Sequence, residues 1–413
     1  MCNLFMRIIT ILTIITSQVG AVELGGFLSE NLSMKFQDEQ EFIKKETWLR
    51  LKLRSRMESS GLFTDIDLRY DPLYHSIPEL KIREAYADLS LGQFDLRFGQ
   101  QIVIWGKADE FNPTDFINPE DYREFISLNK TDRKIGLFYP KIDYYFGNYK
   151  VEGIFIPFFT PSEIPMDTSH PWIPYQIKDI IVNPKIILNE QEEPKNELKN
   201  SEYGLKFGAT MPGFDFSFCY FEGFFDLPVM FREAIILLDT IVISPKYKRF
   251  RAGGFDFTTI LKDLGLRGEL AYVDKGYYIT TDLLDTDGIV EKANLSFVLV
   301  ADYKFLEDLY LNFQWIGRYI FDYEDGIDED ELENRFVFSC HKYFFYEELK
   351  LGLSGMVYNL RDQDYMLQPY LEYSVTDGVF FGTGCYVFGG KEQSMLGQFS
   401  KNDCFFLKTS YYF

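Results

Sequence analysis

Residues 309–319 read LYLNFQWIGRY, and apolar and polar side chains alternate along this stretch with a period of two. One face of an extended strand here would carry mainly Leu, Phe, Trp and Tyr, whereas the other would carry Asn312, Gln314 and Arg318. Such alternation is typical of a β-strand that lies between an apolar and a polar environment. The same pattern recurs from Thr47, so the chain is predicted to consist largely of strands of this kind.

The connections between the strands separate a barrel from a soluble two-sheet sandwich. Extending the alternation gives about eighteen segments of roughly ten residues, the length that crosses a bilayer when a strand is tilted. Short turns alternate with longer connections along the chain, which predicts an all-β fold: a transmembrane up-and-down antiparallel β-barrel of about 18 strands, with about 16 as the second choice. A soluble secreted β-protein is the alternative. The predicted turns lie near residues 59–61, 92–93, 147–148, 212–213, 262–263, 307–308, 346–347 and 377–378.

The composition limits what such a barrel could bind. The chain has 63 acidic and 42 basic residues and a net charge of −21, which excludes a nucleic-acid partner that needs a basic surface. Aromatic residues make up 18% of the sequence. Tyr and Trp favour the boundary between lipid and water, so we expect them to form girdles around the barrel.

The first 21 residues have the features of a secretory signal peptide. Arg7 precedes an apolar run from Ile8 to Ile15, and Val19 and Ala21 occupy the small-residue positions before a cleavage site. We therefore predict a signal peptide over residues 1–21 and a single outer-membrane β-barrel over residues 22–413. Two long connections, residues 105–132 and 158–200, are predicted to be extracellular loops. The second is rich in proline and cannot continue a central strand.

Two stretches resemble known outer-membrane proteins. The last strand resembles the signal that the barrel-assembly machinery of Gram-negative bacteria reads, with Phe405, Leu407, Tyr411 and Phe413 on one face. Residues 97–121 resemble the Gly-Gln, Trp-Gly, Asn-Pro signature of a porin-like family of unknown function, itself loosely similar to alginate-export barrels. We expect outer-membrane lipid, lipopolysaccharide and that assembly machinery as partners. The motif residues are Gly99, Gln100, Trp105, Gly106, Asn112, Pro113, Asp115, Asn118, Pro119 and Asp121.

The motif also has a direct physical interpretation. Trp105 is predicted to lie at the membrane interface where a strand ends, and Gly106 would permit a bend. The two Asn-Pro pairs are turn signals in series, so they favour a shaped loop. This loop either seals the barrel mouth or folds inward as a constriction that sets selectivity.

Charged residues on alternate positions predict the lining of the lumen. If Leu49, Leu51 and Leu53 face lipid, their neighbours face the lumen, because charge on the lipid face is penalised. A lumen rich in guanidinium groups favours anionic solutes. Alternatively, acidic residues on the same faces pair with the cations and neutralise them. The predicted basic ladder comprises Arg50, Lys52, Arg54, Arg56, Arg97, Arg267, Arg318 and Arg335, and the opposing acids are Asp65, Asp67, Glu84, Asp88, Glu202 and Glu269.

No catalytic, metal or cofactor site is predicted. The acidic run from Asp322 to Glu333 fails the calcium-loop pattern, because Gly326 is one position too early. His341 and Ser339 share one strand face but lack a third partner for catalysis. We therefore expect a porin-like channel in the outer membrane of a Gram-negative bacterium. It would allow passive diffusion or export of small or elongated solutes, and the basic ladder predicts that these solutes could be anionic. The other alternative is a binding or adhesion barrel that uses its extracellular loops.

Overall fold

The computed structural model describes residues 22–36, 41–109, 111–124, 130–236, 240–282, 285–305, 308–359 and 363–413. The predicted signal peptide over residues 1–21 lies outside these ranges. Outside the sheets, the short helices are α2 Lys130–Arg133 and α3 Tyr175–Val182, with 3-10 turns η1 Tyr122–Glu124, η2 Leu198–Asn200 and η3 Gly397–Asn402. No helix among the described residues is long and apolar enough to cross a membrane.

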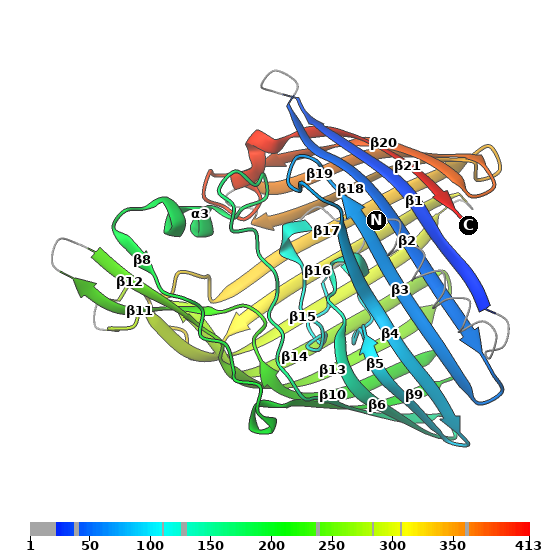
Figure 1. Cartoon of the computed structure of the whole chain (residues 1–413), viewed down its shortest axis with the longest axis horizontal. Coiled ribbons are helices and arrows are strands. Elements are labelled where there is room, and N and C mark those ends of the chain that lie inside the picture. The colour runs from blue at the N-terminus through cyan, green and yellow to red at the C-terminus, as the bar shows by residue number, and fades with distance from the viewer. Residues whose placement is uncertain are drawn as a thin grey trace.

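Eighteen strands form one closed antiparallel sheet (Figure 1). Each strand pairs with its neighbours in chain order, and the first strand pairs with the last, so the sheet has no free edge. The predicted 18-stranded barrel is confirmed. Its strands are β1 Val22–Lys35, β2 Phe42–Arg56, β3 Ser60–Tyr70, β4 Glu79–Leu91, β5 Phe94–Gln101, β6 Leu137–Phe146, β7 Tyr149–Ile156, β9 Glu202–Met211, β10 Phe214–Phe224, β13 Arg249–Leu261, β14 Leu264–Ile279, β15 Ile289–Phe305, β16 Leu309–Ile320, β17 Leu332–Phe344, β18 Leu349–Asn359, β19 Asp364–Thr376, β20 Val379–Gly389 and β21 Cys404–Tyr412.

A second, small sheet lies beyond one end of the barrel. It consists of β8 Ile186–Leu188, β11 Val229–Ile236 and β12 Thr240–Lys246, with β12 in the middle. The β11–β12 hairpin projects away from the barrel wall on the side where the long connections gather (Figure 1). This sheet therefore belongs to the loops and not to the barrel.

Strand β16 shows why alternation produces a barrel. Phe313 and Trp315 are 48% and 39% exposed on the outside, whereas Asn312 and Gln314 are 7% and 2% exposed on the inside. Because successive side chains of a strand point to opposite faces, an apolar outer surface and a polar interior follow from one period-two sequence. The stretch at residues 309–319 thus folds as predicted.

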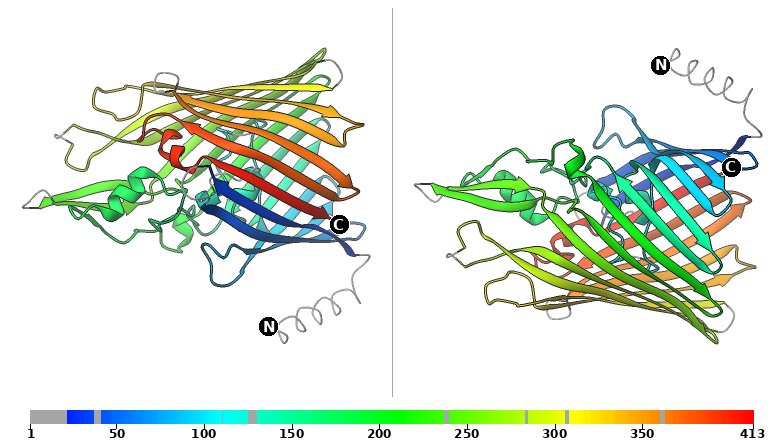
Figure 2. Two further views of the ribbon diagram at one scale, coloured as in Figure 1. Left: turned by 90° about the horizontal axis from the view of Figure 1, so that it is seen from above. Right: turned by 90° about the horizontal axis from the view of Figure 1, so that it is seen from below.

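Both ends of the described chain lie at the end of the barrel that has the short turns (Figure 2). As far as the described residues reach, the predicted turns lie where consecutive barrel strands are connected. Gly92 and Gly147, for example, adopt φ values of 63° and 58°, as tight hairpin turns require. Phe413 and Gly26 exchange backbone hydrogen bonds of 3.1 and 3.0 Å, which fixes the last residue beside the first strand.

Candidate functional site in the barrel interior

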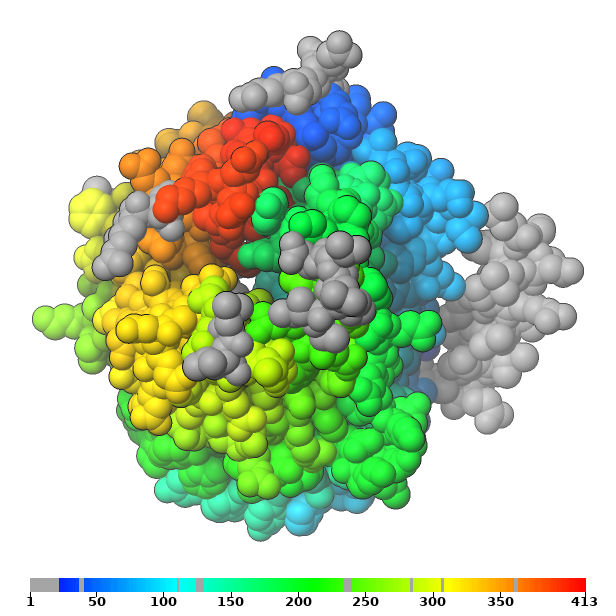
Figure 3. All heavy atoms as spheres, turned by 90° about the vertical axis from the view of Figure 1, so that its left-hand side faces the viewer, coloured from blue at the N-terminus to red at the C-terminus, as the bar shows by residue number. Residues whose placement is uncertain are grey.

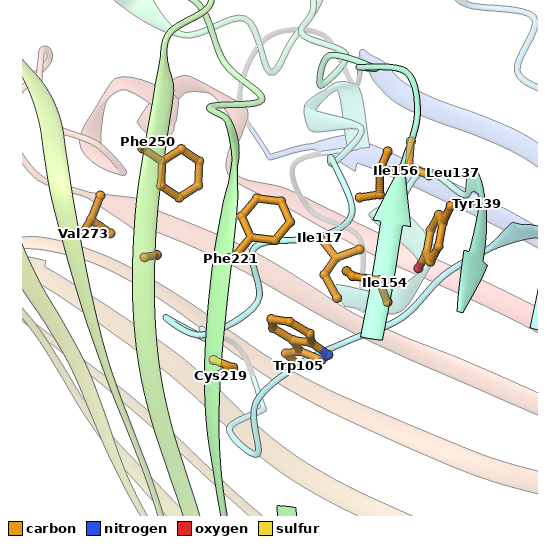
Figure 4. Close-up of a cluster of buried hydrophobic side chains, with 11 residues drawn as sticks. Trp105, Ile117, Leu137, Tyr139, Ile154, Ile156, Cys219, Phe221, Phe250 and Val273 are labelled. Carbon is orange, nitrogen blue, oxygen red and sulfur yellow. The ribbon is translucent and has the colours of Figure 1, made fainter. Parts of the chain in front are cut away.

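Between β5 and β6, the described residues 102–109, 111–124 and 130–136 fold into the lumen; we call them the inner loop. Trp105 is 1% exposed, and together with Ile117 it packs against side chains of β7 and β10 that point inward (Figure 4). The largest cluster of buried apolar residues in the described chain therefore lies inside the barrel, between the inner loop and one side of the wall. The described residues of this loop therefore fold inward, and its role as a constriction that sets selectivity stays a prediction.

The prediction that Trp105 lies at the membrane interface is wrong. Its indole Nε1 donates a 2.7 Å hydrogen bond to Glu152, an inward residue of β7, and its ring lies against Gly204. Strand β5 ends at Gln101, and the chain then turns toward the barrel axis. Burial of the indole against the inner wall, with a partner for its N–H, replaces the interfacial position that the sequence suggested.

Glu269 of β14 anchors the tip of the inner loop to the far wall. Its Oε1 accepts hydrogen bonds from the backbone of Lys107 and Ala108, at 2.6 and 2.7 Å, and from Asn112 at 2.8 Å. Its Oε2 accepts from the hydroxyl of Thr114 at 2.8 Å. A Cβ on Gly106, which has a φ of 101°, would lie 2.6 Å from both carboxylate oxygens. Glycine is required there because backbone and carboxylate approach so closely.

The two Asn-Pro pairs shape the returning half of the inner loop. Asn118 accepts a hydrogen bond from the backbone of Val103 at 2.8 Å and donates one to Ile135 O at 2.8 Å, so it ties the two legs of the loop together. Asp115 pairs with Lys134 at 2.9 Å. Burial lowers the pKa of the Lys134 amine, but Asp115 and Glu120 outweigh it, and the pKa lies above its ordinary value.

The other motif residues lie away from the contact with Glu269. Gly99 has a φ of 136°, and a Cβ there would clash with the backbone of Ala85. Gln100 donates to Ile82 O at 2.7 Å. Pro113 and Pro119 are buried, and Asp121 pairs with Arg123 at 2.7 Å. The motif as a whole therefore builds the inner loop and its exit from β5.

A network of ions fixes the near end of the inner loop to β2, β3 and β4. Arg50 donates to Asp67 at 2.7 Å and to Asp132 of α2 at 2.6 Å, and Arg83 donates to Asp132 at 3.0 Å and to Thr131 O at 2.6 Å. The donor in each of these hydrogen bonds is a guanidinium, so all are charge-assisted, which is the stronger kind. The inner loop is thus held at both walls of the barrel.

Arg83 was missed by the sequence analysis because of a β-bulge. The pairing of β3 with β4 shifts between Asp65 and Ile66, which leaves Arg83 without a partner residue across the ladder. Ile82 is exposed on the outside, while Arg83 and Glu84 both point inward. Two adjacent charged residues after an outward Ile were the only sign of this bulge in the sequence.

Most of the predicted basic ladder is ion-paired in the lumen. Arg54 instead lies 5.0 Å from the Phe63 ring centroid, and the exposed Arg56 lies close to the β2–β3 turn. Most cations of the ladder are therefore neutralised, and a preference of the lumen for anions stays a prediction. The closest partners are Asp132 for Arg50, Asp88 for Arg97, Asp109 for Arg267, and Glu333 for Arg318 and Arg335.

The opposing acids that remain also have fixed partners. Glu84 accepts a hydrogen bond from the backbone of Ile102 at 2.9 Å, and Glu202 accepts one from Phe224 N at 2.6 Å. Asp65 lies 3.6 Å from Arg50. These carboxylates therefore bind groups of the barrel wall and of the first residues of the inner loop.

A cavity of about 480 Å³ lies between the inner loop and the wall formed by β1, β2, β20 and β21. Among the described residues Lys408 makes no ion pair, and Lys52, whose side chain is 48% exposed, is 3.9 Å from its nearest carboxylate, Asp65. Lys408 was also missed by the sequence analysis, although it alternates with the outward residues of the last strand. The charged residues that line the cavity are Lys44, Arg50, Lys52, Arg69 and Lys408, with Glu46 and Asp132.

The Pro-rich segment, residues 158–200, crosses the mouth above the inner loop. Glu163 exchanges backbone hydrogen bonds with Glu120 and Tyr122 of the inner loop, at 3.0 and 2.7 Å. Trp172 then packs against Phe388 and Phe399 on the opposite side of the barrel. Viewed onto the mouth, loops from several strand pairs gather over the opening (Figure 3).

The residues of the predicted assembly signal all lie on the outer face of β21. Phe405, Leu407, Tyr411 and Phe413 are exposed there, while Cys404, Phe406 and Ser410 point inward. This arrangement places the apolar side of the last strand toward lipid. Recognition of these residues by assembly machinery stays a prediction.

Comparison with known proteins gives the class of the fold. No protein-family model and no curated protein matches the chain. OpdL of Pseudomonas aeruginosa has a similar structure, with a TM-score of 0.54 at 10% identity over 96% of this chain and 99% of OpdL. OccK11 (OpdR) of the same organism has a TM-score of 0.51 at 10% identity over 95% of each chain. The protein thus has the fold of porin-type outer-membrane β-barrels.

Proposed function

We propose that the protein is an outer-membrane channel through which small anionic solutes diffuse. The observation that carries this proposal is the cavity beside the inner loop, which two lysines line without a close carboxylate. Within the described residues Lys408 makes no ion pair, and Lys52 is 3.9 Å from Asp65. The chain as a whole has a charge of −21, so this positive charge is local. A pore lined by uncompensated cations lowers the barrier for anions and raises it for cations.

Lys52 and Lys408 are the residues expected to set this selectivity. They lie on β2 and β21, on either side of β1. Arg50 is unsuited to the role, because Asp67 and Asp132 already share its charge. The inner loop and the Pro-rich segment narrow the route, which favours small solutes over elongated ones.

Planar-bilayer recordings test the proposal. In a salt gradient, the wild-type channel should give a reversal potential displaced toward that of chloride. Replacing both lysines, Lys52→Gln with Lys408→Gln, should move the reversal potential toward that of potassium. Neutralising a bonded pair, Arg97→Gln with Asp88→Asn, leaves the net charge of the lumen unchanged and serves as the matched control.

The recordings also have a clear negative outcome. A conducting double-lysine variant whose reversal potential equals that of the wild type would reject the anion path. A folded barrel that gives no conductance steps would reject a channel altogether.

A binding or adhesion role is the second candidate, and one observation favours it. The sheet of β8, β11 and β12 projects from the loop end of the barrel and is larger than a connection between neighbouring strands requires (Figure 1). In this case the barrel would be an anchor. Absence of conductance together with binding of whole cells to a surface ligand through residues 229–246 would support this role.

A further inference from the structure

A group of polar side chains lies on the outer surface of the barrel, where an apolar surface is otherwise expected. It occupies the loop end of β9, β10, β13, β14 and β15, next to the outward apolar residues Leu205, Phe218 and Leu270. We call this group the outer rim patch. It comprises Tyr203, Tyr220, Glu222, Arg249, Arg251, Asp274, Lys275 and Glu291.

Glu222 is the centre of the outer rim patch. It accepts hydrogen bonds from the hydroxyl groups of Tyr203 and Tyr220, at 2.6 and 3.2 Å. Arg249 and Arg251 each donate to it through Nε, at 3.0 and 3.2 Å. One carboxylate therefore holds two guanidinium groups in place on the outer wall and neutralises only one of them.

The three acids of the patch equal its three bases in number, but they leave some donors of the basic groups without an acceptor. Asp274 accepts its 2.7 Å hydrogen bond from the backbone N–H of Arg251 and not from the side chain. Among the described residues, Arg251 uses its Nε alone, and its side chain is 64% exposed. Lys275 pairs with Glu291 at 2.8 Å, and both are about half exposed. The terminal nitrogens of Arg251 are thus free to bind an anion.

The position of the patch indicates the source of that anion. Tyr and charged residues at the end of a spanning strand lie at the level of lipid headgroups. If the loops face outward, as the proposed function requires, this level is that of the outer leaflet. Guanidinium and ammonium groups bind phosphate through charge-assisted hydrogen bonds.

We infer that the outer rim patch binds the phosphate of a phosphorylated glycolipid of the outer leaflet, with Arg251 and Lys275 as the main ligands. The apolar residues below the patch would contact the acyl chains of the same molecule. Because a free phosphate ion gains nothing from those apolar contacts, the patch should prefer the lipid.

Native mass spectrometry of the detergent-solubilised protein with diphosphoryl lipid A tests this inference. The variant with Arg251→Gln and Lys275→Gln should bind lipid A roughly 10- to 30-fold more weakly, as expected for the loss of two interfacial cations. Lys342→Gln is the matched control, because Lys342 is an exposed basic residue on the outer face of β17 near the opposite rim. It should leave binding unchanged.

Three results would overturn the inference. They are equal binding by the double variant and the wild type, an equal loss in the Lys342 variant, and displacement of lipid A by millimolar inorganic phosphate, which would indicate a free-anion site. Conductance of the same samples separates this inference from the proposed function. A double variant that still conducts, with or without lipid binding, leaves the channel role intact.

Discussion

At the scale of single residues, Glu269 links two parts of the chain that are more than 150 positions apart. Its carboxylate accepts hydrogen bonds from backbone N–H groups, from the Asn112 amide and from the Thr114 hydroxyl. Buried donors that lose their acceptor carry the full cost of desolvation. One acidic side chain on the wall therefore decides whether the inner loop crosses the lumen in a single conformation.

We predict that Glu269→Gln loosens the inner loop without unfolding the barrel. An amide has one acceptor oxygen and no charge. If that oxygen stays with the N–H groups of Lys107 and Ala108, the NH₂ group faces the backbone N–H of Thr114, which loses its acceptor. Weakening these hydrogen bonds should cost roughly 2–3 kcal/mol of loop stability. Single-channel current should become noisier, and amide exchange over residues 105–124 should become faster. Asp215→Asn is the control, since Asp215 is an inward acid of β10, and an unchanged exchange pattern in the Glu269 variant would contradict the prediction.

At the scale of elements, the inner loop and the Pro-rich segment both cross the barrel opening and contact each other there. The inner loop rests on an apolar cluster at one wall and on ion pairs at both, and the Pro-rich segment is bonded to it through Glu163. Glu120 lies where the two meet, 3.1 Å from Lys134 and 3.3 Å from Arg133. The carboxylate of Glu120 thus fixes the inner loop at the point where its backbone is bonded to the Pro-rich segment.

We predict that acid loosens this junction. Burial alone would raise the pKa of Glu120, but Lys134 and Arg133 outweigh it and bring the pKa below its ordinary value of 4.5. A carboxyl group whose pKa is depressed in the folded state contributes stability above its unfolded pKa and loses it as the pH falls through the folded value. Channel recordings should therefore be steady from pH 7 to 5 and show new gating events below about pH 4.

The variant Glu120→Gln gives the control for the pH prediction. It lacks the titrating group, so it should gate at pH 6 much as the wild type gates in acid. Identical recordings of the wild type at pH 6 and pH 3.5 would show that Glu120 does not hold the junction.

At the scale of the whole molecule, closure of the sheet is the condition for a stable protein in lipid. The pairing of β1 with β21 removes the last two rows of unpaired N–H and C=O groups. Each such group would cost several kcal/mol in hydrocarbon. Stability of this barrel is therefore a property of the complete ring of strands.

We predict that deleting residues 404–413 abolishes folding. The deletion exposes the edges of β1 and β20 to lipid, and neither has another partner within the described chain. The variant should be fully sensitive to protease in refolding assays and should lose strand signal in circular dichroism. Removing residues 230–244, most of the projecting hairpin, should leave the barrel resistant. Recovery of a protease-resistant barrel without β21 would refute the prediction.

The residues of the inner loop show which features could be predicted from the sequence and which could not. The motif from Gly99 to Asp121 predicted a shaped loop, because Asn-Pro turns act locally. It did not place Trp105, whose ring is amphipathic and suits either the interface or a buried wall with a partner such as Glu152. Nor did it predict Arg83, since a bulge shifts the alternation on which every inward or outward assignment rests.

The sequence by itself determined the strands, their number, the sites of the turns and the outer apolar face. These follow from the period of two and from turn residues, which are properties of neighbouring positions. Only the tertiary structure decided which lumen charges are paired, that the inner loop crosses to Glu269, and that Lys52 and Lys408 lie beside a cavity without a close carboxylate. The physical reason is that ion pairing depends on distances across the barrel, between residues far apart along the chain.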